Sequence, residues 1–159
     1  MSILRIIGAL MIAFSGAFAA YSLNKSAKDT LSQTEYFISL VRFLRAQIEC
    51  FSMSVPRALG RAPDEILSGC GFSGEKRPQS IGELLDGCRV TDEAVMRDMR
   101  RLAYDIGKGY REEQLTLCDY CLSLLEGQRV RIAGQLPLKI KVNSVLSLAG
   151  AAAVVILLI

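Results

Sequence analysis

Two cysteines three positions apart, Cys118 and Cys121, are the residues whose spacing most directly suggests chemistry. One helical turn brings such a pair together, and the two sulfurs of a CxxC motif can bind a metal ion or form a reversible disulfide. A structural zinc site needs two more ligands, which would have to be other cysteines because the chain has no histidine. A thioredoxin-type centre needs a βαβ context, whereas this pair lies within a predicted helix. Both sulfurs fall on or beside the apolar face of that helix, so the pattern favours core packing.

A group of basic residues forms a second candidate site: Arg97, Arg100, Arg101 and Lys108. They lie opposite the apolar stripe of a predicted helix and could contact anionic lipid headgroups or an acidic partner. Two aspartates in the same segment dilute the charge, and charge runs are also typical of solvated helix faces. Both interpretations stay open.

Other familiar catalytic arrangements are missing from the sequence. Without histidine, His-based catalysis and His-containing metal sites are excluded. Gly107-Lys108-Gly109 lacks the spacing of a phosphate-binding loop, and the adjacent Glu112 and Glu113 would point to different sides of a helix. We therefore expect no catalytic residue, no cofactor and no bound metal, and a protein that is not an enzyme.

Composition limits the class of protein further. The chain has 159 residues, 51% of them hydrophobic and 22% charged, with a net charge of +3. This length predicts one domain, and the apolar content excludes a disordered chain. The charge is too small for a nucleic-acid-binding domain. The apolar residues gather at the ends, because no charged residue occurs from Ile6 to Asn24 or from Val142 to Ile159.

The two apolar ends predict transmembrane helices over residues 1–23 and 142–159. About 20 apolar residues in a helix cross a hydrocarbon core of roughly 30 Å. The first segment also resembles a secretory signal peptide that would be cleaved before Ala20. Its apolar character continues to Leu23, and an oxidising compartment would leave one of five cysteines unpaired, which favours a retained span.

Lysines at the inner ends of both segments predict the orientation. Lys25 and Lys28 follow the first span, and Lys139 and Lys141 precede the second. Positive charge stays on the cytoplasmic side, so both termini should lie outside and residues 24–141 in the cytoplasm. Arg5 opposes this assignment.

Small residues recur in both spans and are candidates for helix packing within the membrane: Ala9, Ala13, Ala17 and Gly150. Such stripes let helix backbones approach closely, either between the two spans or between subunits of a homo-oligomer. Alanine and glycine are also common in spans without any such role.

The segment between the spans predicts an all-α helical bundle. One long helix should run from Tyr21 to Val55, and a region rich in proline and glycine should follow it with short helices over 56–59, 64–70 and 80–88. The last of these begins with a capping box, Ser80 and Glu83. The apolar residues at helical spacing in the long helix are Phe37, Leu40, Val41, Leu44, Ile48 and Phe51.

Two further helices complete the predicted bundle. One opens at Thr91 to Glu93 and is ended by Gly107 and Gly109. The other runs from Tyr110 or Arg111 to about Gln135, and Pro137 should bend the chain before the second span. The expected buried positions are Val95, Met99, Leu102 and Ile106 in the first, and Leu115, Cys118, Leu122 and Leu125 in the second.

The whole layout resembles the stage III sporulation protein AB family. An opening Leu4-Arg5-Ile6-Ile7-Gly8-Ala9 span and a terminal span ending Val154-Val155-Ile156-Leu157-Leu158-Ile159 enclose four internal stretches in the order of that family. The internal stretches are Leu44 to Glu49, Val55-Pro56-Arg57-Ala58-Leu59, Gly107-Lys108 and Arg111-Glu112-Glu113-Gln114.

The resemblance implies a platform protein of the secretion-like channel complex between mother cell and forespore. The family's bundle is similar to the helical domain of platform proteins in type II secretion and type IV pilus machines. Its implied partners are membrane lipid, the other channel subunits and the complex's secretion-type ATPase, with no nucleic acid. Two alternatives remain at this point: a tail-anchored secreted binding domain left after signal cleavage, and a thiol or metal protein that uses the CxxC.

Overall fold

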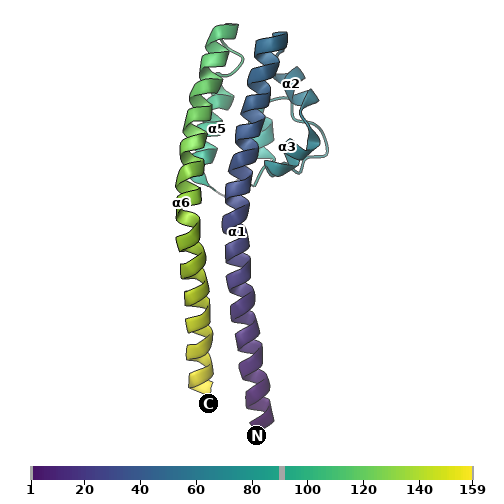
Figure 1. Ribbon diagram of the computed structural model, residues 1–159. Coiled ribbons are helices and arrows are strands. Elements are labelled where there is room, and N and C mark those ends of the chain that lie inside the picture. The colour runs from purple at the N-terminus through teal and green to yellow at the C-terminus, as the bar shows by residue number, and fades with distance from the viewer. Residues whose placement is uncertain (1, 90–91, 159) are drawn as a thin grey trace. The chain divides into compact units, whose positions relative to one another are not determined.

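The computed structural model describes residues 2–89 and 92–158, without the side chains of 2–10, 12, 13, 148, 151 and 154–158. The described residues form α-helices and no strand, which confirms the all-α prediction; an isolated β-bridge pairs Phe72 with Cys88. The helices are α1 (Ser2–Phe51), α2 (Val55–Arg61), α3 (Asp64–Gly69), α4 (Ile81–Asp86), α5 (Glu93–Asp105) and α6 (Arg111–Leu158) (Figure 1).

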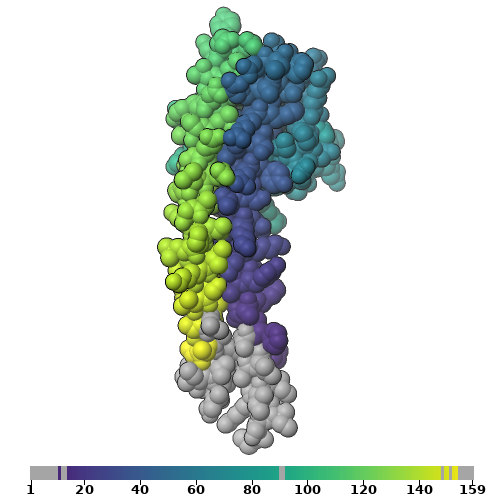
Figure 2. All heavy atoms as spheres, in the orientation of Figure 1, coloured from purple at the N-terminus to yellow at the C-terminus, as the bar shows by residue number. Residues whose placement is uncertain are grey.

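The chain divides into two compact units. Thr30–Ile132 forms the bundle unit, and Met1–Asp29 with Ala133–Ile159 forms the helix-pair unit. Both long helices belong to both units, since α1 and α6 each continue past a boundary. In the bundle unit, side chains of α1 and α6 meet along the face seen in Figure 2.

The core of the bundle unit is built on the apolar stripe of α1. The predicted positions Phe37, Leu40, Val41, Leu44 and Ile48 are all buried. They recur at intervals of three and four residues, so one face of the helix turns inward. The other helices contribute fully buried side chains to the same cluster, including Leu59, Leu84, Met99, Leu102 and Leu125.

The prediction that Phe51 continues this stripe is wrong. Its side chain is 66% exposed. The helix ends at this residue, four positions before the predicted end at Val55, and Ser52 takes a positive φ of 46°. The chain therefore turns toward α2 before position 51 can be covered.

The region between Ser52 and Arg89 contains three short helices, as predicted. The capping box of α4 is present, since Ser80 Oγ accepts a hydrogen bond from the Glu83 amide at 3.1 Å. The Glu83 carboxylate accepts the amide of Gln79 at 2.6 Å, one residue before the predicted donor. Arg77 ties the loop before α4 to the end of α2 by donating to the carbonyls of Gly60 and Ala62 at 3.0 and 2.7 Å, and to the start of α3 through an ion pair with Asp64 at 2.5 Å.

Asp92 begins α5 and links it to α6. Its carboxylate accepts the amides of Ala94 and Val95 at 3.0 and 3.2 Å, and Arg131 of α6 donates to both its oxygens at 2.9 and 2.8 Å. Partial burial by itself raises the pKa of Asp92, but the hydrogen bonds from Arg131, Val95 and Ala94 outweigh it and the pKa is lowered. Thr91, the other predicted opening residue, lies outside the described residues.

The prediction that the last helix ends near Gln135 is wrong, because α6 continues through Pro137 to Leu158. Proline lacks the amide hydrogen and crowds the carbonyl of Ala133, at a cost of about 3 kcal/mol in a helix interior. That loss removes one backbone hydrogen bond from a helix of 48 residues. Helix propagates cooperatively on both sides of such a defect, so one missing bond does not end it.

The predicted spans belong to the helix-pair unit, and several of their side chains lie outside the described residues. Within the part of the chain that the structure describes, no helix is both long enough and apolar enough to cross a membrane. The described apolar side chains of this unit are nevertheless exposed, notably Met11, Phe14, Phe18, Tyr21, Leu23, Leu138, Val142, Val145 and Leu146.

The candidate small-residue stripe is described only in part. The side chains of Ala9 and Ala13 lie outside the described residues. Ala17 and Gly150 are exposed, and a Cβ added to Gly150 would meet no atom within 4 Å. The space beside position 150 is therefore open to a partner helix from outside the described residues.

Removing the Asp92 carboxylate should weaken the bundle and change its response to acid. Asp92→Ala should lower the free energy of unfolding by about 1–2 kcal/mol, because a helix cap and an ion pair are lost together. The folded-state pKa of Asp92 is lowered, so its stabilisation is complete above the unfolded pKa of about 3.9 and is lost as pH falls through the folded value. Asp92→Asn should therefore flatten the acid dependence of stability below about pH 4.

Urea unfolding of the full chain in detergent, followed by circular dichroism between pH 7 and pH 2, measures both effects. Asp86→Asn, at an exposed residue at the end of α4, is the matched control. Equal acid dependence in wild type and Asp92→Asn would contradict the assignment.

Candidate functional site

The predicted basic residues form one exposed stripe with two tyrosines. Along α5, Arg97, Arg101 and Tyr104 follow one another at intervals of four and three residues, so they share a face, and Lys108 lies in the turn after the helix. The Lys108 Nζ lies 3.3 Å from the centre of the Tyr104 ring. The Arg101 guanidinium lies 5.4 Å from the ring centre of Tyr120 on α6. We call this surface the cation–tyrosine stripe: Arg97, Arg100, Arg101, Tyr104, Lys108 and Tyr120.

Packing of the opposite face of α5 explains why the stripe is exposed. Val95, Met99 and Leu102 are buried in the core as predicted, while the predicted Ile106 is half-buried at the end of the helix. Asp98 is also buried; it accepts a hydrogen bond from Gln128 of α6 at 3.3 Å. These contacts hold one face of α5 against the bundle and leave the cations in solvent.

The stripe has little internal charge pairing. Several other arginines of the bundle are held by carboxylates of neighbouring elements, as in Arg42–Glu126 at 2.7 Å and Arg129–Glu35 at 2.9 Å. Among the described residues, the ion pair of the stripe is the long contact of 3.8 Å between Arg97 and Asp98. The stripe therefore keeps cationic charge available to a binding partner.

Sequence reasoning identified the cations and missed the tyrosines beside them. Tyr104 lies three residues after Arg101 and four before Lys108, and its side chain is 73% exposed. The sequence contained a signal for it, because the helical spacing of Tyr104 from Arg101 places an aromatic side chain on the charged face. Tyrosine and arginine carry much of the binding energy in protein interfaces, so the pairing makes this surface a candidate for protein recognition.

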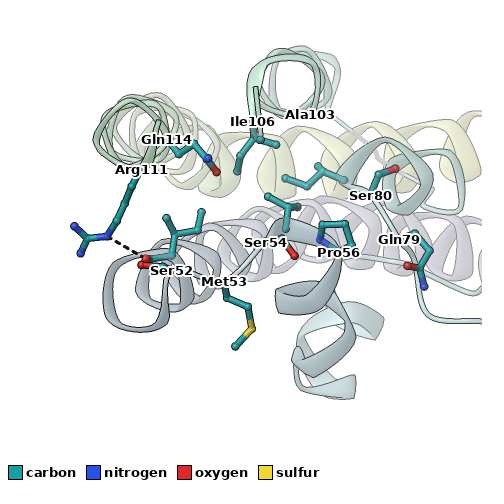
Figure 3. Close-up of a pocket in the computed structure, with 14 residues that line it drawn as sticks. Ser52, Met53, Ser54, Pro56, Gln79, Ser80, Ala103, Ile106, Arg111 and Gln114 are labelled. Atoms are coloured by element: carbon teal, nitrogen blue, oxygen red, sulfur yellow. Dashed lines mark hydrogen bonds between the residues drawn. The ribbon is translucent and has the colours of Figure 1, made fainter. Parts of the chain in front are cut away.

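A cavity of about 430 Å³ lies within the bundle unit where several elements end or begin (Figure 3). It is bounded by the end of α1, the start of α2, the start of α4, the end of α5 and the start of α6. In Figure 3, Ile106 points toward Ser54, before α2, and Pro56, in its first turn. The apolar lining residues include Ile48, Val55, Ile81, Ala103 and Ile106, and the polar ones include Ser52, Ser54, Gln79, Arg111 and Gln114.

Hydrogen bonds hold the rim of this cavity in place. Arg111, the first residue of α6, donates to the carbonyls of Ile48 and Glu49 at 3.4 and 2.5 Å. It thereby caps the end of α1, whose last carbonyls lack partners within the helix. Gln114 donates to the carbonyl of Gly109 at 2.8 Å and closes the turn between α5 and α6. These hydrogen bonds therefore fix the walls of the cavity where α1 and α5 end and α6 begins.

Each of the four internal stretches that carry the family resemblance contributes to this cavity. The contributing residues are Ile48, then Val55 with Pro56, then Gly107, and finally Arg111 with Gln114. These stretches are separated in sequence, and the fold brings them around one space. Nothing in helical periodicity indicates that they meet, so from the sequence they form only a series along the chain.

The CxxC pair lies in the hydrophobic core, as the apolar pattern predicted. Cys118 and Cys121 are both buried. Burial raises the pKa of Cys118 to about 11 and that of Cys121 to about 12, and neighbouring negative charge adds to both shifts. Across the described residues, no group of three or more cysteine, aspartate or glutamate side chains is arranged to hold a metal ion. Cys50, in contrast, is exposed at the end of α1.

Comparison of the chain with family models, with curated proteins and with solved structures gives no match.

Thiol accessibility should separate Cys50 from the other four cysteines. At pH 8, a thiol with a pKa of about 11 is ionised to roughly one part in a thousand, and the thiolate is the reactive form. Treatment of the folded full chain with an aromatic disulfide reagent should modify Cys50 rapidly and the other cysteines only after denaturation. Cys50→Ser should abolish the fast phase, whereas Cys118→Ser should leave it intact. Rapid modification of Cys118 or Cys121 would instead favour the thiol-protein alternative.

Proposed function

We propose that this protein is a non-enzymatic membrane platform of a sporulation channel complex, placed in the mother-cell membrane around the forespore. The observation that carries the proposal is the convergence of all four internal family-like stretches on one cavity of the bundle. A binding site common to a family would bring residues from separate stretches of the sequence together in this way. A hydroxyl nucleophile needs an adjacent general base. The hydroxyls that line the cavity belong to Ser52, Ser54 and Ser80, and the lining residues include no aspartate, glutamate or lysine beside them.

The membrane placement is supported by the apolar surface of the helix-pair unit. Phe14, Phe18, Tyr21 and Leu146 are exposed large apolar residues on its two helix segments. Covering one such side chain is worth about 1.5–3 kcal/mol, so this surface favours contact with lipid. The full sequence adds two uncharged runs, 6–24 and 142–159. In this arrangement both termini lie outside and the bundle faces the cytoplasm.

The proposed partners of the bundle are the secretion-type ATPase of the complex and neighbouring channel subunits. The cation–tyrosine stripe suits an acidic protein surface, since its cations keep most of their charge available. The stripe ends at Lys108, directly after Gly107 in the wall of the cavity. One partner surface can therefore place acidic groups on the stripe and an apolar side chain in the cavity.

Crosslinking in sporulating cells tests this docking. A photoreactive amino acid at Arg101 should capture the ATPase or another channel subunit, whereas the same group at the exposed Arg61 of α2 should not. Arg97→Glu combined with Arg100→Glu should reduce the crosslinking yield from position 101 by about tenfold, because charge complementarity is reversed.

A second variant tests the cavity. Ala103→Leu, which fills the cavity, should also reduce the crosslinking yield from position 101, and Ala46→Leu on an exposed part of α1 is the control for this substitution. Capture of lipid alone from Arg101 would contradict the proposal.

Topology provides a separate test, with Cys50 as its reporter. A membrane-impermeant maleimide added to intact cells should leave Cys50 unmodified and should label it after permeabilisation. Intact mass should include residues 1–19. Labelling from outside, or a chain that starts at Ala20, would favour the secreted, tail-anchored alternative.

A further inference from the structure

A polar cluster joins the two segments of the helix-pair unit. Asn24 Nδ2 donates to Ser144 Oγ at 3.3 Å, and Asn143 Nδ2 donates to Asn24 Oδ1 at 3.4 Å. The segments run antiparallel, as Figure 1 shows. Amide and hydroxyl contacts of this kind bridge apolar helices. They define the register of this unit, because position 24 of α1 must lie opposite positions 143 and 144 of α6.

This register brings four lysines to one level of the helix pair. A helix rises about 1.5 Å per residue, so Lys25 and Lys28 lie roughly 1.5 and 6 Å beyond Asn24, on the side away from the N-terminus. In the antiparallel segment, Lys141 and Lys139 lie about 3 and 6 Å from Asn143 in the same direction. The four positions therefore occupy about one helical turn along the pair.

Helical rotation places three of these lysines on the same side of the pair. The half-buried residues that mark the facing sides are Gly16, Ala20, Asn24 and Ala27 of α1, and Leu136, Ile140, Asn143 and Ser147 of α6. Each residue is turned by about 100° from the previous one. Lys25, Lys28 and Lys141 consequently emerge on one side, and Lys139 on the opposite side. All four side chains are exposed.

No carboxylate of the described residues neutralises the charge of these lysines. None of the four forms an ion pair with a described residue, in contrast to the paired arginines of the bundle. Asp29 is the one acidic side chain in the sequence of the helix-pair unit. Lysine presents a compact ammonium group that suits a phosphate oxygen. The three-lysine side therefore offers a site for an anionic group.

The neighbouring surface identifies what kind of anion fits. Tyr21 follows Ala20 as Lys25 follows Asn24, so it emerges on the three-lysine side, and Phe14 shares that face because it lies two helical turns earlier. Both side chains are exposed and lie toward the uncharged end of α1. An occupant must accordingly combine a negative group at the lysines with an apolar body beside them. A phospholipid has this structure, whereas an acidic peptide or a free phosphate lacks the apolar part.

We propose that Lys25, Lys28 and Lys141 form a binding site for the phosphate of an anionic phospholipid headgroup, with Asn24, Asn143 and Ser144 holding the two helices in register. This inference rests on the membrane placement proposed above. It assigns lipid binding to the helix-pair unit and leaves the cation–tyrosine stripe of the bundle for protein contact.

Native mass spectrometry of the full chain from mixed micelles tests the site. The micelles contain phosphatidylglycerol and phosphatidylcholine with identical acyl chains. Wild type should retain phosphatidylglycerol preferentially, and Lys25→Gln/Lys28→Gln/Lys141→Gln should reduce that preference by about tenfold or more. Arg57→Gln/Arg61→Gln/Lys76→Gln removes the same charge from exposed bundle residues and should keep it. Unchanged preference in the lysine variant, or equal loss in both variants, would overturn the proposal, as would an acidic protein bound in place of lipid.

Two further measurements separate failure of this site from failure of the membrane placement. Asn24→Cys with Ser144→Cys, in a Cys50→Ser background, should form an intrachain disulfide on oxidation; an exclusively interchain product would overturn the register. Alkaline carbonate should leave wild type and the lysine variant in the membrane fraction. Release of the wild-type protein into the soluble fraction would contradict the proposed membrane placement and, with it, the lipid site.

Discussion

The pairing of α1 with α6 within the bundle is the contact on which the rest of the structure depends. The buried stripe of α1 supplies the apolar area, and ion pairs such as Arg45–Asp119 at 2.6 Å and Arg129–Glu35 at 2.9 Å follow its borders. Each exposed pair is worth only about 0–1 kcal/mol, so the pairs specify register more than they add stability. With the two long helices held in this way, α5 docks through Asp92 and Asp98, and the short helices cover the remaining core.

Charge pairing divides the described surface of the protein into regions that differ in their capacity to bind a charged partner. Five arginines of the bundle pair with carboxylates on neighbouring elements, which makes them part of the fold. Two clusters of cations lack such pairing among the described residues: the cation–tyrosine stripe on α5 and α6, and the lysines of the helix-pair unit. The first has aromatic neighbours and suits a protein, whereas the second has exposed apolar neighbours toward the uncharged end of α1 and suits a lipid. The proposed platform role would use both surfaces.

Sequence reasoning succeeded where a local pattern has one physical meaning. Periodicity identified the buried faces of α1 and α5, and the Ser80–Glu83 spacing identified a cap that the structure contains. It failed at Phe51 and Pro137. Position 51 has the right spacing for burial, but the helix ends there and nothing follows to cover it. Pro137 is a helix breaker by its chemistry, yet the long helix around it tolerates the loss of one hydrogen bond.

The sequence alone determined the all-α class, the segregation of apolar residues to the two ends, and the faces along which the helices pack. These properties follow from the order of residues and from helical geometry, which act over a few turns. Only the tertiary structure decided that Ile48, Val55, Gly107 and Arg111 surround one cavity, and that Tyr120 joins the arginines of α5. Such juxtapositions depend on where helices end and how they cross, and those are settled by the packing of the whole core.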